Sequence, residues 1–334
     1  CQTIDHVLVD TGSVGLRVLS SAIPAGLNLV AQVGSAGLPL LSCAQFVDNS
    51  FAWGPVVTAD VALGAKRASA VPVQVIADPA YNKLQGACST TGNALTSAAI
   101  LGAKGILGVG LFQQDCGQRC TTTLANGYYY TCSGAACLTA TRSTASIAQQ
   151  IKNPVPLFAT DNNGLVIDLP SVSNSGATSV IGSMIFGVGT QSNNQVSGST
   201  LLMTNASGNI TTVFAGRQLT DSFLDTGSNG LYFDSSTIVG CTGNAIGFYC
   251  PASLTTLSAT LSGTNGLSIP VTFAIDNALN LFAGVSNIVL PTLSGTIGSS
   301  RTFDWGLPFF LGRRVAFGIE GQASALGTGP YYAF

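Results

Sequence analysis

Two copies of the tetrapeptide Asp-Thr-Gly-Ser are the feature of this sequence that points most directly to chemistry. The first copy begins at Asp10, within Val7–Leu16, and the second begins at Asp225, within Ser222–Leu231. Each copy follows an apolar run and precedes an x-Gly-Leu segment. This repetition indicates that one part of the chain is a diverged duplicate of the other.

Each copy would place a carboxyl group at the end of a strand. The apolar run carries the aspartate to the end of a sheet, the glycine allows a sharp turn, and the threonine and serine hydroxyls brace the loop. If two such loops face each other, their carboxyls lie within a few ångströms, roughly hydrogen-bonding range, and cannot both ionise. The ionised carboxyl can then take a proton from a water that attacks a carbonyl, while the protonated one stabilises the oxyanion.

The composition removes most other reactions. Charged residues make up 8% of the chain, which contains one histidine, His6, and one glutamate, Glu320. A metal site built on several histidines is impossible, and a glycosidase pair of two glutamates is excluded, although aspartate pairs remain. A net charge of −2 with 12 scattered basic residues provides no surface for nucleic acid or for an anionic membrane. We therefore expect aspartate chemistry without a metal or cofactor.

Short strands must position these carboxyls. Runs rich in β-branched and aromatic residues recur along the chain, and 40 glycines and 13 prolines supply the turns. Helical patterns are few and short, as at residues 143–150. No apolar run reaches the roughly 18 residues of a membrane span. The sequence predicts a mostly β protein that is long enough, at 334 residues, for two domains.

The duplicated motif and the apolar, glycine-containing segments that follow each copy resemble the pepsin-like aspartic proteases. The closest likeness is to a bacterial branch of secreted proteins with the same duplicated Asp-Thr-Gly-Ser, and it covers nearly the whole chain. It implies a bilobal fold of two pseudo-twofold-related, β-barrel-like lobes with a cleft between them. We place the N-terminal lobe at residues 1–170 and the C-terminal lobe at residues 171–334.

The resemblance implies roles for both loops. Asp10 and Asp225 would be the catalytic pair. Thr11 and Thr226 would bridge the loops, and two serines would bind the outer carboxylate oxygens. The full set of expected bracing residues is Thr11, Gly12, Ser13, Thr226, Gly227 and Ser228.

An apolar-apolar-Gly element passes behind each loop in this family. Residues 106–108, Ile-Leu-Gly, match it in the first lobe. In the second lobe either Asp304-Trp305-Gly306 or residues 310–312 could serve. We prefer the former because the aromatic and β-branched residues after it continue the family pattern.

A β-hairpin flap closes the cleft in this family, and residues 44–63 are the candidate. The flap tyrosine has no counterpart here, the nearest residue being Phe46, and Trp53 lies further along the hairpin. Arg17 replaces a tryptophan expected seven residues after Asp10; directed at the site, it would favour the ionised form of Asp10. We expect Phe46, Trp53 and Arg17 to lie at the substrate site.

Nine cysteines indicate an oxidising compartment, so we expect a secreted protein, extracellular or periplasmic. A zinc site made by the four cysteines between residues 116 and 137 is an alternative, disfavoured by their irregular spacing. Proximity in sequence predicts the disulfides Cys43–Cys88, Cys116–Cys120, Cys132–Cys137 and Cys241–Cys250.

The start of the chain carries a further expectation. Nine residues precede Asp10, fewer than the family has, and the chain begins at Cys1. We expect Cys1 to have no partner among the other eight cysteines and to link to an upstream segment of the precursor. A lipid anchor on Cys1 is the alternative.

The function that we expect is that of an aspartic endopeptidase acting on peptides or unfolded proteins. One alternative is a pepsin-like protein that binds a peptide or protein with little or no turnover. Another is a structural component of an extracellular assembly. A Ser-His-Asp triad is disfavoured, because His6 on a strand would lie about 13 Å from Asp10.

Overall fold

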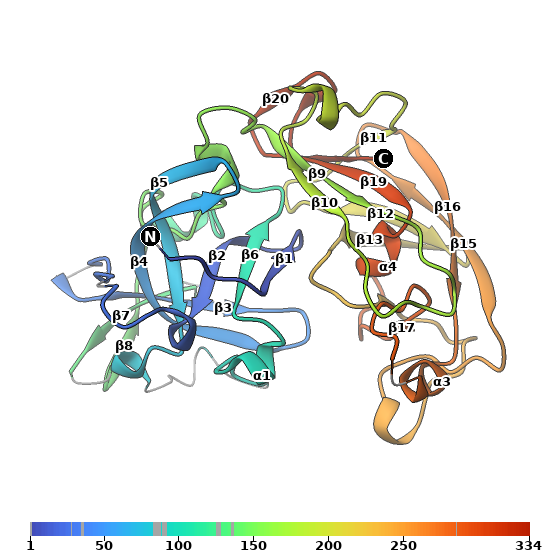
Figure 1. Ribbon diagram of the computed structural model, residues 1–334, viewed down its shortest axis with the longest axis horizontal. Coiled ribbons are helices and arrows are strands. Elements are labelled where there is room, and N and C mark those ends of the chain that lie inside the picture. Colours follow the sequence, from blue (N-terminus) through green and yellow to red (C-terminus); the bar gives the residue numbers. More distant parts are fainter. Residues whose placement is uncertain are drawn as a thin grey trace. The chain divides into compact units, whose positions relative to one another are not determined.

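A computed structural model describes residues 2–27, 29–34, 37–82, 88, 92–124, 128–134, 137–284 and 286–334. Strands make up 41% and helices 11% of the structure, so the prediction of a mostly β protein is confirmed. The chain divides into two compact units, Cys1–Ala159 and Thr160–Phe334, called here the N-terminal and C-terminal units. Figure 1 shows the ribbon of each unit and labels many of its elements, among them β1 and β13.

The N-terminal unit is built on one eight-stranded sheet. Its longest pairing joins β4 to β5 antiparallel, through a turn at Gly64, whose φ of 58° lies in the left-handed region. In spatial order the strands are β1 (Val7–Asp10), β6 (Gly105–Val109), β2 (Val14–Leu19), β5 (Lys66–Ile76), β4 (Phe51–Leu63), β3 (Leu40–Gln45), β7 (Tyr129–Ser133) and β8 (Thr139–Arg142).

The C-terminal unit contains a seven-stranded sheet. In spatial order its strands are β16 (Ser268–Ile275), β15 (Thr255–Ser262), β12 (Ile210–Phe214), β13 (Arg217–Leu224), β18 (Phe303–Trp305), β14 (Leu231–Phe233) and β17 (Ser294–Gly295). Aromatic rings fill its core: Phe303 stacks on Phe233 at 4.5 Å and on Trp305 at 3.9 Å between centroids. The Trp305 indole also donates to Thr212 Oγ1 at 2.9 Å, which satisfies its buried N–H.

A five-stranded sheet completes the C-terminal unit, with a two-stranded ribbon of β20 (Ala323–Ser324) and β21 (Gly327–Thr328). The five strands, in spatial order, are β10 (Ser183–Phe186), β9 (Gly164–Leu169), β19 (Arg313–Gly318), β22 (Tyr331–Ala333) and β11 (Leu201–Met203). The boundary placed after residue 170 from the sequence differs from the structural division after Ala159. The reason is that β9 pairs with β10 and β19, so residues 160–170 belong to the C-terminal unit.

Helices are short in the described residues. The α-helices are α1 (Ala98–Leu101), α2 (Arg119–Thr122), α3 (Ala278–Ala283) and α4 (Leu307–Phe310), and the 3-10 turns are η1 (Ser20–Ala22), η3 (Pro79–Tyr81), η4 (Val155–Leu157), η5 (Ser192–Asn194) and η6 (Gly243–Ala245). The expected helix at residues 143–150 is wrong: this stretch forms a turn, and Gln150 is buried and donates to the carbonyls of Gly117 and Ala145. Eight residues form too short a helix to persist without an apolar face to bury.

All four predicted disulfides are present, so the connectivity expected from proximity is confirmed and the four-thiolate zinc alternative is wrong. Two of them, Cys43–Cys88 and Cys132–Cys137, lie in one core cluster with Phe51, Trp53 and Tyr130. The expectation for Cys1 lies outside the described residues. In the part of the chain that the structure describes, no helix has the length and apolarity to cross a membrane.

Candidate active site

In the N-terminal unit, Asp10 is the last residue of β1 and its carboxyl is held by its own loop. The backbone N–H of Gly12 donates to Asp10 Oδ1 at 2.9 Å, and Ser13 Oγ donates to Asp10 Oδ2. Asp10 is buried, with 5% of its surface exposed. Hydrogen bonds to both of its oxygens therefore fix the orientation of this carboxyl.

Strand β6 passes directly behind this loop. It pairs with β1 in parallel and with β2 antiparallel, so Gly108 lies opposite both Asp10 and Gly15. A Cβ on Gly108 would lie 2.6 Å from the backbone of Val14. Residues 106–108 thus occupy the place expected of the apolar-apolar-Gly element, and the last of them must be glycine because backbone fills the space of a side chain.

The C-terminal unit repeats this loop at Asp225. The backbone N–H of Gly227 donates to Asp225 Oδ1 at 2.7 Å, and Ser228 Oγ donates to Asp225 Oδ2 at 2.8 Å. The N–H of Asp225 donates to the carbonyl of Trp305 at 3.0 Å. Both serine-to-carboxylate hydrogen bonds expected from the sequence are therefore present, one in each unit.

The two alternatives for the element behind the second loop are resolved by β18. This strand lies between β13 and β14, with Leu224 opposite Trp305, the residue just before Gly306. A Cβ on Gly306 would lie 2.0 Å from the carbonyl oxygen of Gly230 and 2.7 Å from that of Ser228. Asp304-Trp305-Gly306 is the element in question, whereas Gly312 packs against Ser171.

Thr11 and Thr226 are both buried. Each follows its aspartate directly and lies next to the glycine that donates to the carboxyl. Buried hydroxyl groups are generally hydrogen-bonded, and hydrogen bonds from these two threonines would brace their loops. The expectation that these two threonines bridge the loops stays a prediction.

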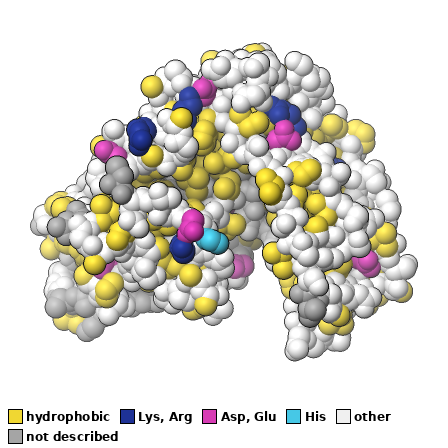
Figure 2. Space-filling model, in the orientation of Figure 1, with side chains coloured by type: hydrophobic (Ala, Val, Ile, Leu, Met, Phe, Trp, Pro, Cys, Tyr) yellow, Lys and Arg dark blue, Asp and Glu magenta, His cyan; other side chains and the backbone are white. Residues whose placement is uncertain are grey.

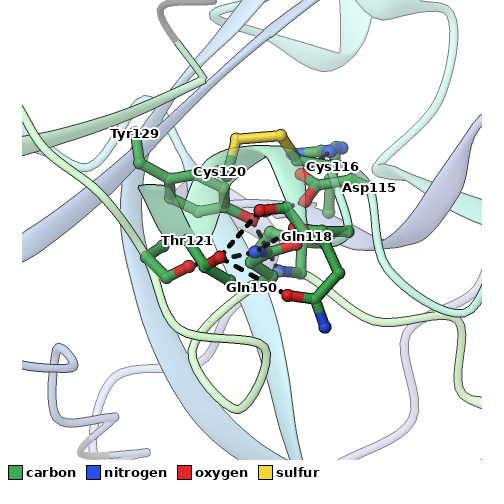
Figure 3. The surroundings of a disulfide bond; sticks show 11 residues. Asp115, Cys116, Gln118, Cys120, Thr121, Tyr129 and Gln150 are labelled. Atoms are coloured by element: carbon green, nitrogen blue, oxygen red, sulfur yellow. Dashed lines mark hydrogen bonds and ion pairs between the residues drawn. A yellow bond between two sulfur atoms is a disulfide. The ribbon is translucent and has the colours of Figure 1, made fainter. Parts of the chain in front are cut away.

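Arg17 does not have the place at the substrate site that was expected. Its side chain is buried; Nη2 lies 3.0 Å from Asp115 Oδ2 and Nη1 donates to Gln74 Oε1 at 2.6 Å. Tyr129 donates its hydroxyl to the other carboxyl oxygen of Asp115 at 2.5 Å. Figure 3 shows Asp115 and Tyr129 beside the disulfide Cys116–Cys120, which closes the turn after Asp115.

Burial controls the ionisation of this cluster. It raises the pKa of Asp115, although the charge of Arg17 and the hydrogen bonds from Tyr129 and Arg17 act in the opposite direction. It also raises the pKa of the Tyr129 hydroxyl well above its ordinary value, with the neighbouring Asp115 charge adding to the effect. The guanidinium of Arg17 is thus a structural partner of Asp115, and a buried ion pair of this kind braces β2 against β5 and the turn at residue 115.

Trp53 was also misplaced by the sequence reasoning. Its indole N–H donates to the carbonyl of Tyr81 at 2.9 Å, and its ring packs edge-on against Tyr130 at 5.2 Å. The side chain is buried in the core of the N-terminal unit, so it cannot reach a peptide in solution. The hairpin expected over residues 44–63 exists as β3 and β4, and its turn spans residues 46–50.

Phe46 lies at that turn and is half-buried, packed on a cluster that includes Leu19 and Ile76. The backbone of Phe46 closes the turn: its N–H donates to the carbonyl of Ser50 at 2.9 Å, and its carbonyl accepts from the N–H of Asn49 at 2.9 Å. Its ring is therefore tied to the core on one side. Packing on the core therefore accounts for the position of this ring.

His6 is exposed and its Nδ1 lies 3.1 Å from Asp5 Oδ2. This pairing agrees with the surface role that the sequence favoured over a catalytic triad. Among the described residues, no group of three or more His, Cys, Asp or Glu side chains could hold a metal ion. Figure 2 shows the charged side chains as small separate groups on the visible face, without a continuous basic patch.

The comparison with protein families is decisive for classification. A family model described as "Protein of unknown function (DUF3443)" matches residues 1–334. The chain belongs to this family. No curated protein matches it. In this member of the DUF3443 family, the two braced carboxyls are the feature from which a function can be argued.

Sequence reasoning missed Asp304, which lies in this site. Its carboxyl is buried and Oδ2 lies 2.5 Å from Ser228 Oγ. The sequence did contain the signal. In the preferred element Asp304-Trp305-Gly306 a carboxyl stands where the first lobe has Ile106, and a charged residue in an apolar position next to a candidate active-site loop is a functional clue.

Proposed function

We propose that this DUF3443 protein is an aspartic endopeptidase with a pepsin-like, bilobal fold. One observation carries the proposal: both copies of Asp-Thr-Gly-Ser form the same loop, with each carboxyl held by a glycine N–H and a serine hydroxyl. The same strand arrangement supports it, since β6 lies between β1 and β2 as β18 lies between β13 and β14. Two unrelated turns would not share a loop, a register and a buried glycine.

The proposed reaction is the hydrolysis of a peptide bond by a water bound between Asp10 and Asp225. The ionised carboxyl takes a proton from the water as its oxygen attacks the carbonyl carbon, and the protonated carboxyl donates its proton to the carbonyl oxygen. A tetrahedral diol forms. When it collapses, the carbon–nitrogen bond breaks, the amine nitrogen takes the proton held by the first carboxyl, and the second carboxyl takes a proton back from a hydroxyl of the diol. The proposal requires the two carboxyls to lie close enough to share one proton.

The loops are suited to this exchange of protons. Each aspartate accepts one hydrogen bond from an N–H group and one from a hydroxyl, on different oxygens. Donors that are fixed before the reaction stabilise a negative charge without reorganisation. In the proposed enzyme, a peptide binds in an extended conformation between the lobes, where its backbone supplies affinity and alternate side-chain pockets supply preference.

The proposed location is extracellular or periplasmic. Four disulfides, two of them in a buried core cluster, fit an oxidising compartment.

A second candidate function is peptide binding without turnover. The observation that favours it is the place of the residues expected at the flap, since Trp53 is buried and Phe46 packs on the core. A flap that offers neither side chain to a substrate would contribute less to closing the site over the reacting bond.

The decisive experiment measures cleavage. The purified full-length protein is incubated with an unfolded protein substrate between about pH 3 and pH 7, with and without a statine-type transition-state mimic. Asp10→Asn and Asp225→Asn should each lower the rate by at least about 100-fold, because each removes a group that moves a proton. Asp5→Asn is the matched control, since Asp5 is exposed and pairs with Lys104 and His6 at the surface.

The outcomes separate the candidates. Cleavage that the mimic inhibits, and that both variants lose while Asp5→Asn retains it, supports the endopeptidase. Binding of the peptide mimic with no cleavage at any pH supports the second candidate. Cleavage that survives in both aspartate variants refutes the proposed mechanism.

A further inference from the structure

The hydroxyl of Ser228 lies between two carboxyl groups. Its oxygen is 2.8 Å from Asp225 Oδ2 and 2.5 Å from Asp304 Oδ2. Both distances are within the range of an O–H···O hydrogen bond, and the shorter is typical of one that involves an ionised or acidic partner. Three oxygen atoms therefore form a continuous chain from the buried Asp304 to the candidate catalytic Asp225.

The number of protons that these three oxygens can share is limited. A serine hydroxyl carries one hydrogen, which it can donate fully to one acceptor, and it has two lone pairs with which to accept. If both carboxyls were ionised, one of the two short contacts would join two oxygens that have no hydrogen between them. The geometry is satisfied when one carboxyl is protonated and donates to Ser228 Oγ, while the serine donates to the other.

Burial indicates which carboxyl carries the proton. Asp304 is 2% exposed, whereas Asp225 is half-buried and accepts a second hydrogen bond from the N–H of Gly227. Removal from water disfavours the charged form of a carboxyl, and hydrogen bonds to a carboxylate favour it. Both effects place the proton on Asp304 and the negative charge on Asp225.

The titratable side chains on the elements around β18 are compatible with this arrangement. Burial raises the pKa of Tyr332, and the negative charge of Asp225 adds to the effect, so this neighbour stays neutral. The others have their own partners: Arg217 donates to backbone carbonyls, Arg301 pairs with Asp221, and Tyr232 bonds Asn229.

The loop at Asp10 has no carboxyl at the position that corresponds to Asp304. There the residue two positions before the glycine of the inner strand is Ile106, which is buried and has no proton to give. The corresponding residue of the second loop is Asp304. Ser13 and Ser228 make the same bond to their aspartates, so the two loops differ in the group behind the serine.

We propose that Asp304 is a positioning residue that holds a proton and donates it to Ser228 Oγ, which donates its own hydrogen to Asp225 Oδ2 and keeps Asp225 ionised. Its consequence for catalysis rests on the proposed function: Asp225 is then the carboxyl that accepts the proton of the attacking water. The two aspartates of the pair have different roles because the two halves of the chain differ at one buried position.

The first test needs no substrate. The chain contains thirteen aspartates, so carbon-13 labelling of the aspartate carboxyl carbons gives a tractable NMR spectrum. The Asp304 signal is assigned by its loss in Asp304→Asn, a variant that keeps the shape and a hydrogen-bond donor. We expect this signal to keep the chemical shift of a protonated acid up to about pH 6, well above the ordinary aspartate range. An ionised chemical shift at about pH 5 would overturn the proposal.

The second test measures the pH dependence of cleavage. In Asp304→Asn the amide still donates to Ser228, so the acid limb of the kcat profile should stay within about 0.3 pH units of the parent protein. In Asp304→Leu the donor is lost and the acid limb should move up by about one unit. Asp221→Asn on β13 is the control and should not move it. Equal profiles for the Asn and Leu variants, with both folded, would overturn the role in positioning.

The two proposals can fail separately. A protein that cleaves nothing but shows a protonated Asp304 refutes the endopeptidase and supports the proton assignment. A protease whose Asp304 is ionised at about pH 5 supports the endopeptidase and refutes the assignment.

Discussion

Arg17 and Asp115 form a buried ion pair whose disruption would test how the N-terminal unit is held together. The charged atoms are 3.0 Å apart, and the side chains are 4% and 5% exposed. Arg17→Met removes the cation and leaves Asp115 buried beside Tyr129. Breaking a buried pair in this way costs about 3–5 kcal/mol, because an uncompensated charge is left out of water. With a urea m-value of about 1–3 kcal/mol per M, the unfolding midpoint of this unit should fall by at least about 1 M.

The loss should depend on pH with a definite sign. Burial raises the pKa of Asp115 in the folded unit. A raised folded-state pKa means that the carboxyl contributes most to stability below its unfolded value of about 4, and that this contribution is lost as pH rises through the folded value. Arg17→Met raises the folded pKa further. The deficit of the variant should therefore be largest near neutral pH and should shrink as the pH approaches about 4.

The sequence provides a reporter for this measurement. One tryptophan, Trp53, lies in the N-terminal unit and the other, Trp305, lies in the C-terminal unit, so fluorescence of a Trp305→Phe background follows the N-terminal unit during urea unfolding. Lys104→Met, in the same unit, is the control; it breaks an ion pair with Asp5 whose side chains are 44% and 64% exposed, so the unfolding midpoint of the N-terminal unit should hardly change.

The double variant Arg17→Met with Asp115→Leu should recover most of the lost stability, since apolar residues can replace a buried pair at little cost. The reasoning is refuted by a loss below about 1 kcal/mol for Arg17→Met, or by a deficit that grows as the pH falls.

Three further predictions concern packing. Trp53→Phe should lower the free energy of unfolding, measured by denaturation, by about 1–2 kcal/mol, because the hydrogen bond from the indole to a backbone carbonyl is lost. In a peptide assay, any cleavage rate should stay within about twofold of the parent protein. Gly306→Ala should destabilise the C-terminal unit by more than about 1 kcal/mol, because its Cβ would lie 2.0 Å from a carbonyl oxygen, whereas Gly240→Ala, whose Cβ meets open space, should change stability by less than about 0.5 kcal/mol. Replacing both Cys43 and Cys88 with alanine should lower the free energy of unfolding by about 4 kcal/mol, because the disulfide closes a loop with a sequence separation of 45. An unchanged thermal midpoint in the double variant would contradict this prediction.

Part of the architecture could be predicted from the sequence, because it depends on interactions between residues that are close in sequence. The four disulfides join cysteines that are neighbours in sequence or are the remaining pair, and proximity was sufficient to assign them. The loops at Asp10 and Asp225 have hydrogen bonds that span two or three residues, so the tetrapeptide itself encodes them. The close approach of the backbone at Gly108 and Gly306 could be predicted, because both glycines belong to the segments that were expected behind the two loops.

Other features were not readable, because they depend on partners that are distant in sequence. Arg17 contacts Asp115, 98 residues away, and Gln74, 57 residues away, and no local pattern identifies either partner. Trp53 was expected at the substrate site because the sequence indicated a hairpin in this region but not which side of it Tyr130 covers. Residues 143–150 have a helical pattern, yet the buried Gln150 donates to the carbonyl of Gly117, 33 residues away, and the stretch forms a turn instead of a helix.

The sequence alone indicated that any acid–base chemistry of this chain would depend on aspartates, because one histidine and one glutamate leave few other groups, and it singled out two of the thirteen aspartates through their repeated loops. The tertiary structure alone decided what surrounds each carboxyl. It placed Asp304 against Ser228 from 76 residues away and assigned Arg17 to a buried ion pair. The physical reason is that hydrogen bonds within a loop are encoded over a few residues, whereas burial and charge pairing arise only when distant strands pack together.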